Sequence, residues 1–338
     1  MTVSGEIPAS NSEPSHLLLF YAFLGSLAQD LIEETGGSVQ ADRYRRLSRI
    51  RREEFFKSIP DQSELTIALA LGDYLEDRSF LLGSESWESW ERVIIDDPAV
   101  AEDLQAIGRA LGALPGAAWL GGDVEPSLQA FVDWENSAGP PVLGTRDPLR
   151  KVQDDLSRES RPPGAGPHAG GEWWSAPAAA GVPYTTRRLR SFTAVELVCR
   201  DDSFGERRAS VWSVNVAAGA RVAEVHGLAD WAGLVEAYPL DVTGARGLEW
   251  SGRYGWAGPW LVPDWSRLAR DWDGVHVSAE GYLRAQEQTA SVRDGRTVLA
   301  GWNPDATYWL RDVISLTESV PERWIHESGA RARWRKAS

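Results

Sequence analysis

The apolar residues of this 338-residue chain follow two different periods, one on each side of a stretch rich in proline and glycine. Before the stretch, apolar side chains such as Leu24, Leu27 and Leu31 recur at three- and four-residue steps, which is typical of helices. After it, short β-branched runs bounded by glycine or charge clusters, such as 209–214, are typical of strands. We therefore predict a two-domain protein with an N-terminal all-α helical bundle and a C-terminal α+β domain.

The predicted domain boundaries follow this change in the period of the apolar residues. Residues 14–136 are predicted to form the acidic helical bundle, in which Ser63 caps a helix over 65–75. Residues 137–171 are predicted to be a linker, because they offer too little large apolar surface to offset the entropy lost on ordering. Residues 172–325 form a Trp-rich α+β domain and residues 326–338 a basic tail.

Each domain has its own set of predicted elements. Further helices of the bundle are expected at 24–32, 44–55, 87–94 and 98–111. The α+β domain is expected to hold strands at 195–199, 209–214, 221–225, 275–278, 297–300 and 307–310, and helices at 229–238, 264–272 and 280–288.

The formal charge of −14 belongs almost entirely to the first part of the chain. Residues 1–150 hold 25 acidic and 12 basic side chains, a balance of −13. Such a surface repels phosphate backbones and anionic lipids, so nucleic acid and membrane are not expected as partners of this half.

The most apolar run, 17–24, is predicted to be a buried helix rather than a signal or a membrane anchor. The residues before it contain no Lys or Arg, which a secretory signal needs, and Gln29 and Asp30 interrupt the run too early for a membrane span. We therefore expect a cytoplasmic protein.

Several classes of enzyme and metalloprotein lack their sequence signatures in this chain. The single Cys199 excludes Cys-rich zinc and iron–sulfur sites, and the five histidines have no spacing typical of metal ligands. The sequence contains no Gly-x-Ser-x-Gly elbow, no Walker loop and no dinucleotide fingerprint. We expect no metal site, and serine hydrolases, P-loop nucleotidases and Rossmann enzymes lose support.

Tryptophan is concentrated in the second domain, where 13 of the 17 lie at or after Trp173. Trp231, Trp265 and Trp272 fall on the apolar faces of predicted helices, which favours packing in a core. The alternative is a cleft in which aromatic faces stack on a planar ring of a ligand.

Four short segments of the second domain follow one another in a distinctive order. They are Thr185-Thr186-Arg187 after a proline, the strand 221–225, the segment Asp273-Gly274-Val275-His276-Val277-Ser278, and a strand at 298–300 that runs into Asn303-Pro304-Asp305. This order resembles the ADP-ribosyltransferase superfamily, including its RES-type NAD-degrading toxins. The strand at 275–278 is also similar to the Val-His-Leu-Ser strand of RNA 2′-phosphotransferases, which use NAD.

The resemblance implies an NAD-consuming enzyme. Such an enzyme transfers ADP-ribose to a macromolecule, or cleaves NAD at the nicotinamide–ribose bond by hydrolysis or phosphorolysis. The chain lacks the Ser-Thr-Ser triplet and the Glu-x-Glu or Gln-x-Glu pair of the arginine-specific members, so the identity of the catalytic carboxylate is open.

Cleavage of the bond needs an anion near the developing oxocarbenium ion, a cation for the pyrophosphate and an aromatic wall for nicotinamide. Glu287, His276 and Ser278 are the catalytic candidates, and Arg187 and Tyr282 are the candidates for binding NAD. We expect all five to border one concave surface. Ordinary alternatives are a solvated Glu287, an exposed basic run around Arg187, a packed Tyr282 and an exposed sheet surface at His276 and Ser278.

A second function class stays open. The chain is alternatively a non-catalytic protein in which the Trp-rich domain binds one partner and the helical bundle another. The sequence identifies neither this partner nor a macromolecular acceptor of ADP-ribose.

Overall fold

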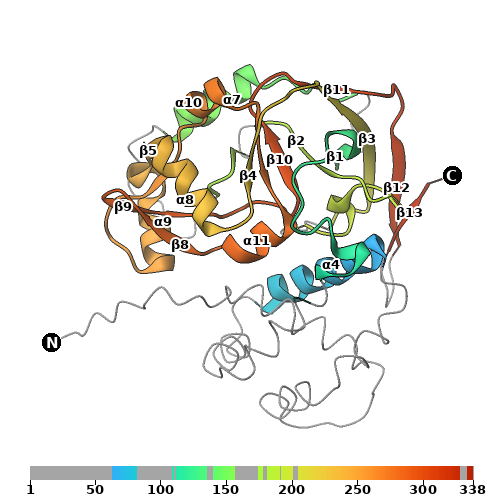
Figure 1. Ribbon diagram of the computed structural model, residues 1–338, viewed down its shortest axis with the longest axis horizontal. Helices are drawn as coiled ribbons and strands as arrows, with labels where there is room; N and C mark the ends of the chain where they lie inside the picture. Colours follow the sequence, from blue (N-terminus) through green and yellow to red (C-terminus); the bar gives the residue numbers. More distant parts are fainter. Residues whose placement is uncertain are drawn as a thin grey trace, which may run out of the picture.

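The computed structural model describes residues 63–81, 109, 112–134, 140–156, 174–177, 181–190, 192–200, 205–327 and 333–337. Their centre is a nine-stranded mixed sheet (Figure 1), in which only β4 and β7 pair in parallel. Eight strands lie side by side in the order β13 (Arg333–Lys336), β12 (Glu322–Glu327), β3 (Arg208–Val216), β1 (Gln129–Asp133), β2 (Tyr184–Arg187), β10 (Ala306–Trp309), β7 (Gly274–Val277) and β4 (Val222–Val225). The ninth strand, β11 (Ile314–Leu316), pairs with the end of β3.

The prediction of an N-terminal all-α bundle is wrong, because residues 129–133 form strand β1 inside the sheet. This strand pairs with β3 on one side and with β2 on the other. Gln129, Ala130, Val132 and Asp133 are all buried, so the strand lacks the apolar–polar alternation that reveals a half-exposed strand in a sequence. The sheet is therefore built from residues on both sides of the boundary predicted at 136.

The helix predicted after Ser63 is confirmed as α4 (Glu64–Leu81). The Ser63 Oγ accepts a hydrogen bond from the Thr66 backbone N–H at 3.2 Å, as expected of a capping residue. Apolar side chains of α4, including Ile67 and Leu71, are buried in the main core. The other helices predicted before 112 lie outside the described residues, except for residue 109. None of the described helices combines the length and apolar character needed to cross a bilayer.

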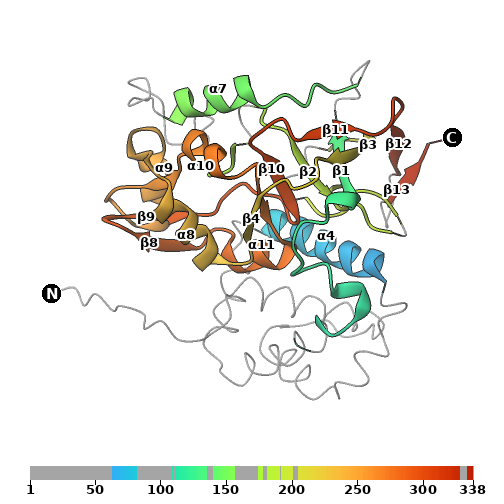
Figure 2. The ribbon, with the colours of Figure 1, turned by 45° about the horizontal axis from the view of Figure 1, so that its top comes forward.

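Part of the predicted linker is a helix. In Figure 2, α7 (Arg146–Leu156) lies above the sheet and α4 below it. Leu149, Val152 and Leu156 are buried at three- and four-residue steps, and α7 packs against α10 (Trp265–Asp271). Proline and glycine on both flanks of the helix hid this short amphipathic pattern. Residues 157–171 of the predicted linker lie outside the described part of the chain.

Most elements predicted after residue 205 are present within two residues of their expected bounds. These are β3, β4, β7, β9 (Gly295–Val298), β10, α8 (Leu228–Ala237) and α10. Helix α11 (Ala279–Ala285) ends earlier than expected. The predicted strand at 195–199 is instead a buried 3-10 turn, Val195–Leu197. Helix α9 (Thr243–Tyr254) and strands β5 (Pro239–Asp241), β6 (Leu261–Pro263), β8 (Thr289–Val292) and β11 were not predicted. Nor were β12 and β13, which pair with each other and place part of the predicted basic tail in the sheet.

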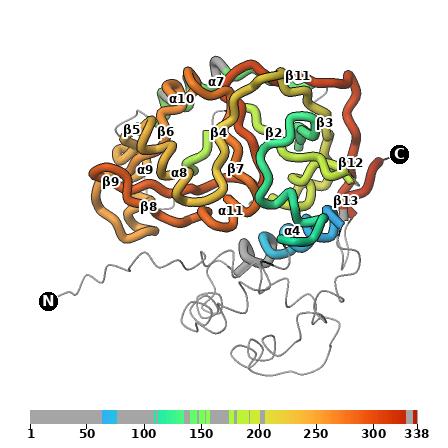
Figure 3. Tube along the Cα trace, viewed as in Figure 1, coloured from blue at the N-terminus to red at the C-terminus, as the bar shows by residue number. Residues whose placement is uncertain are grey.

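Most of the tryptophans at or after Trp173 are buried in the core. Helices α8, α9 and α11 and the two small two-stranded sheets gather at the β4 end of the sheet (Figure 3). There Val225 of β4 and Val277 of β7 pack in one apolar cluster with Trp231 and Trp265. The fully buried tryptophans are Trp231, Trp250, Trp260, Trp265, Trp302 and Trp309, whereas Trp272 is partly buried.

Candidate functional site

A row of polar side chains crosses the sheet on the face away from Val225 and Val277. The register places His276 of β7 beside Thr307 of β10 on one side and Glu224 of β4 on the other. Residues directly across a sheet share a face, whereas successive residues of a strand alternate. The row therefore lies opposite the apolar cluster that Val225 and Val277 join.

A second polar row follows two residues further along, at the carboxyl ends of β4 and β7. The strand pairing brings the end of β2 and the start of β10 to the same edge. The four residues at this position are Arg187, Asp305, Ser278 and His226.

His276 lies buried between two carboxylates. Its Nδ1 is 2.6 Å from the Glu224 Oε2, and its Nε2 is 3.4 Å from the Asp305 Oδ1. Burial lowers the pKa of His276, but hydrogen bonds to Asp305 and Glu224 and their negative charges outweigh burial and raise the pKa to about 9. His276 is therefore an imidazolium at neutral pH, with both nitrogens donating.

Asp305 joins this histidine to Arg187. The carboxylate accepts a hydrogen bond from the Arg187 backbone N–H at 3.1 Å and lies 3.5 Å from the Arg187 Nε. The Arg187 Nη2 also donates to the Asp123 carbonyl at 2.8 Å. Asp305 has a φ of 55°, in the left-handed region that non-glycine residues seldom adopt. A single buried carboxylate thus fixes the positions of two cationic side chains.

His226 continues the network toward solvent. Its Nδ1 is 3.2 Å from the Ser278 Oγ and its Nε2 is 3.0 Å from the Asp123 Oδ1. Ser278 is fully buried, and its Oγ also accepts from the Gly281 N–H as the cap of α11. The side chains of His226 and Asp123 are 37% and 75% exposed, so this end of the network is open to ligands.

Glu224 lies at the boundary between the buried part of this hydrogen-bond network and its solvent-exposed end. Its Oε2 accepts from His276, its Oε1 accepts from the Val124 backbone N–H at 3.1 Å, and its side chain is 21% exposed.

We call the connected set the polar edge cluster, comprising Asp123, Arg187, Glu224, His226, His276, Ser278 and Asp305. Three carboxylates face Arg187 and the protonated His276, so one negative charge is in excess before His226 is counted. Such a cluster favours a cation, or positive charge that develops during a reaction.

The structure brings three of the five predicted site residues together and leaves two apart. Arg187 and His276 share Asp305, and Ser278 contacts His226. Tyr282 is fully buried in the main core, so its ring has no surface on which nicotinamide can stack. Glu287 lies beyond the far end of α11, where its Oε1 pairs with the Arg253 Nη2 of α9 at 2.5 Å. The geometry gives no support to the predicted roles of Tyr282 and Glu287.

Four members of the cluster were not predicted as site residues. Glu224 and His226 stand two apart at the end of a predicted strand, which is the same pattern that marked His276 and Ser278. That signal was present in the sequence. Asp305 ends the Asn303-Pro304-Asp305 segment of the resemblance but was not named as a site residue, and no spacing in the sequence connects Asp123 to the others.

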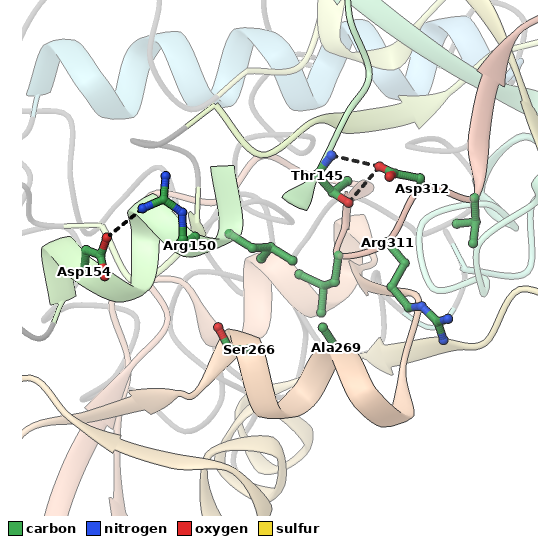
Figure 4. A pocket seen from close by; sticks show the side chains of 10 residues that line it. Thr145, Arg150, Asp154, Ser266, Ala269, Arg311 and Asp312 are labelled. Carbon is green, nitrogen blue, oxygen red and sulfur yellow. Dashed lines mark hydrogen bonds and ion pairs between the residues drawn. The ribbon is translucent and has the colours of Figure 1, made fainter. Parts of the chain in front are cut away.

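A separate groove opens at the opposite end of β10 (Figure 4). It has a volume of about 910 Å³ and lies between α7, α10 and the turn after β10. The Thr145 N–H and hydroxyl both donate to the Asp312 Oδ1 at 2.9 Å, and Arg150 pairs with Asp154 along α7. Because Asp305 precedes β10 and Asp312 follows it, the groove and the polar edge cluster are two distinct places on the sheet.

Comparison with known proteins returned no match: no family model, no curated protein and no solved structure is similar to this chain.

Proposed function

We propose that this chain is a cytoplasmic NAD-consuming enzyme whose active site is the polar edge cluster. It cleaves the bond between nicotinamide and ribose and passes ADP-ribose to a macromolecular acceptor, to water or to phosphate. The observation that carries the proposal is the placement of Glu224, whose carboxylate is held by the buried His276 and the Val124 N–H and is still reached by solvent.

The reaction needs a fixed anion next to the ribose carbon. When the carbon–nitrogen bond breaks, its electron pair goes to nicotinamide and positive charge develops on the ribose carbon and ring oxygen. A carboxylate that is already oriented stabilises this charge without reorganising. Glu224 meets that requirement, because His276 and the Val124 N–H hold both of its oxygens. In this proposal Glu224 takes the role that the sequence assigned to Glu287.

The acceptor must lose a proton as it bonds to the ribose carbon. His226 lies at the same edge, is partly exposed and has its Nε2 3.0 Å from the Asp123 carboxylate. An imidazole next to a carboxylate is suited to take that proton. Arg187 has a positioning role instead, since Asp305 and the Asp123 carbonyl already engage its guanidinium.

The test is the release of free nicotinamide by the purified full-length chain. NAD is supplied alone, with phosphate, and with a mixture of protein acceptors, so that each of the three fates of ADP-ribose is possible. The proposal predicts release that depends on enzyme concentration in at least one condition. A chain that releases no nicotinamide in any of them is not an NAD-consuming enzyme.

The second candidate function is a non-catalytic interaction protein, and the groove of Figure 4 favours it. A groove of this volume is large enough for a short peptide segment, and charges of both signs line it at Arg150, Asp154, Arg311 and Asp312. This candidate predicts no release of nicotinamide and a binding partner whose capture is lost when Arg311 is replaced by Glu. A partner held equally well by the variant would count against the groove.

A further inference from the structure

Three potential metal ligands converge at the open end of the polar edge cluster. One ligand atom each from Asp123, Glu224 and His226 lie within 4.8 Å of one another. The His226 Nε2 and the Asp123 Oδ1 are 3.0 Å apart. Two ligands that are each about 2.1 Å from one zinc ion lie about 3.0–3.5 Å apart. This pair is thus already at the spacing of two ligands, and the third ligand, Glu224, lies within 4.8 Å of both.

Buried groups orient two of the three ligands. The fully buried Ser278 contacts the Nδ1 of His226, and with Nδ1–H donating to that hydroxyl the Nε2 lone pair points at the cluster. The buried His276 holds the Oε2 of Glu224. Zinc-binding histidines and carboxylates are typically held in this way, by hydrogen bonds that their non-coordinating atoms make with neighbouring groups. The solvent-exposed side remains open for an ion to approach.

We propose that Asp123, Glu224 and His226 bind a divalent metal ion of the Zn²⁺ class, with one coordination position left to water. Two carboxylates and one imidazole are a ligand set that Zn²⁺ accepts, and the ion offsets the excess negative charge of the cluster. Residue spacing does not indicate this site, because Asp123 precedes His226 by 103 residues. The rule that looks for closely spaced histidines does not detect such a site.

The ion has a consequence for the proposed reaction, and this step rests on the proposed function. A Glu224 carboxylate that coordinates a metal cannot also face the ribose carbon. Bound Zn²⁺ is therefore an inhibitor that competes with NAD, and removal of the ion by a chelator restores activity.

Binding is tested on the full-length chain after removal of metal by a chelator. Calorimetric titration with Zn²⁺ should show one saturable site, with affinity at least tenfold lower in Asp123→Asn and in His226→Gln. Matched controls are Asp154→Asn on α7 and His326→Gln on β12, which should bind like the parent chain. Because Asp123 and His226 are partly exposed, these variants are expected to fold, and thermal unfolding verifies it.

A second measurement detects the coordinated atom. On addition of Zn²⁺, the ¹⁵N resonance of the His226 Nε2 should shift while that of Nδ1 changes little. The site is refuted if no saturable binding is found, or if His226→Gln binds Zn²⁺ as tightly as the parent chain.

The inhibition is tested in the nicotinamide assay with and without chelator. Zn²⁺ binding at this site in a chain that never releases nicotinamide would support the metal site and reject the proposed function. Release that continues unchanged at saturating Zn²⁺ would overturn the claim that the ion and the reaction share Glu224.

Discussion

At the scale of single residues, Asp305 shows how the polar edge cluster is held together. One buried carboxylate contacts the imidazolium of His276 and both the backbone and the guanidinium of Arg187. Buried charges are costly unless they are paired, and Asp305 is the carboxylate that these two cations share.

Replacing Asp305 with Ala should therefore destabilise the fold strongly. We expect a loss of about 3–5 kcal/mol in the free energy of unfolding, which is typical when one member of a buried ionic network is removed. Asp154→Ala, which removes an exposed carboxylate paired with Arg150, should cost less than about 1 kcal/mol. Urea unfolding of the two variants tests this, and equal losses would show that the Asp305 contacts are not stabilising.

The pKa of His276 makes a second prediction at this scale. The folded value of about 9 exceeds the ordinary value of 6.5, so the folded chain holds a proton that the unfolded chain releases between these values. The stabilisation from His276 is therefore complete below pH 6.5 and is lost as the pH rises through 9. The difference in unfolding free energy between the parent chain and His276→Gln, measured with chelator present, should shrink from pH 6 to pH 9.5. A difference that stays constant or widens would contradict the buried imidazolium.

At the scale of elements, Glu322 ties β12 to its surroundings. Its carboxylate is 3.2 Å from Arg188, just after β2, and 3.2 Å from Lys336 of β13. Partial burial raises the pKa of Glu322, but the positive charges of Arg188 and Lys336 outweigh burial and hold the pKa below its usual range.

A lowered pKa means that the stabilisation is present above the ordinary carboxyl range and is lost as the pH falls through the lowered value. Glu322→Gln should thus reduce Tm by roughly 2–4 °C at pH 7, the shift that about 1 kcal/mol gives in a domain of 150–250 residues. Near pH 2 the reduction should be smaller. Glu327 lies on β12, as Glu322 does, and its exposed carboxylate pairs with Arg335 of β13. Glu327→Gln is therefore the control and should change Tm little at either pH. A loss for Glu322→Gln that is the same at both pH values would refute the charge contacts.

Several of the elements that could be predicted from the sequence have a clear start or stop. Helix α10 begins at Asp264, whose Oδ1 accepts from the Arg267 N–H at 3.0 Å, and α8 ends before Pro239. The turn at 195–197 is buried throughout and β1 at every position except the partly buried Phe131, so no apolar–polar alternation distinguishes strand from helix there. Strands β7 and β10 are also buried at every position and were predicted, so burial on both faces obscures the alternation without always hiding the element.

Residue patterns along single strands likewise predicted only part of the site. His276 and Ser278 were predicted because they alternate with valines on one strand, and Glu224 and His226 show the equivalent pattern on β4. The parallel pairing of β4 with β7 is what brings the two patterns together, and the sequence does not show this pairing. Asp305 and Asp123 enter the site through the course of the chain between strands, which residue spacing does not reveal.

At the scale of the whole molecule, residues from both predicted halves build one sheet. Strand β1 lies between β2 and β3, and α4 is buried in the main core. A fragment that begins at Gly171 loses β1, α4 and α7 together. It should give neither a cooperative thermal transition nor dispersed amide resonances, whereas the full chain gives both. Measurement at several salt concentrations separates failure to fold from precipitation of a nearly neutral fragment, and a cooperatively folded fragment would show that the sheet forms without β1.

In the proposed function, the carboxyl ends of β4 and β7 form the catalytic edge, with Glu224 as its anion. Glu224 and Glu287 are a matched pair for testing it, because both carboxylates have a cationic partner but only Glu224 belongs to the polar edge cluster. The decisive measurement is the rate of nicotinamide release by Glu224→Gln and Glu287→Gln, each verified as folded. We predict a loss of about 100-fold or more for Glu224→Gln, the usual effect of removing one preorganised electrostatic group, and a change within about threefold for Glu287→Gln. A Glu224→Gln variant that keeps the parent rate, or a Glu287→Gln variant that loses as much, would contradict the account.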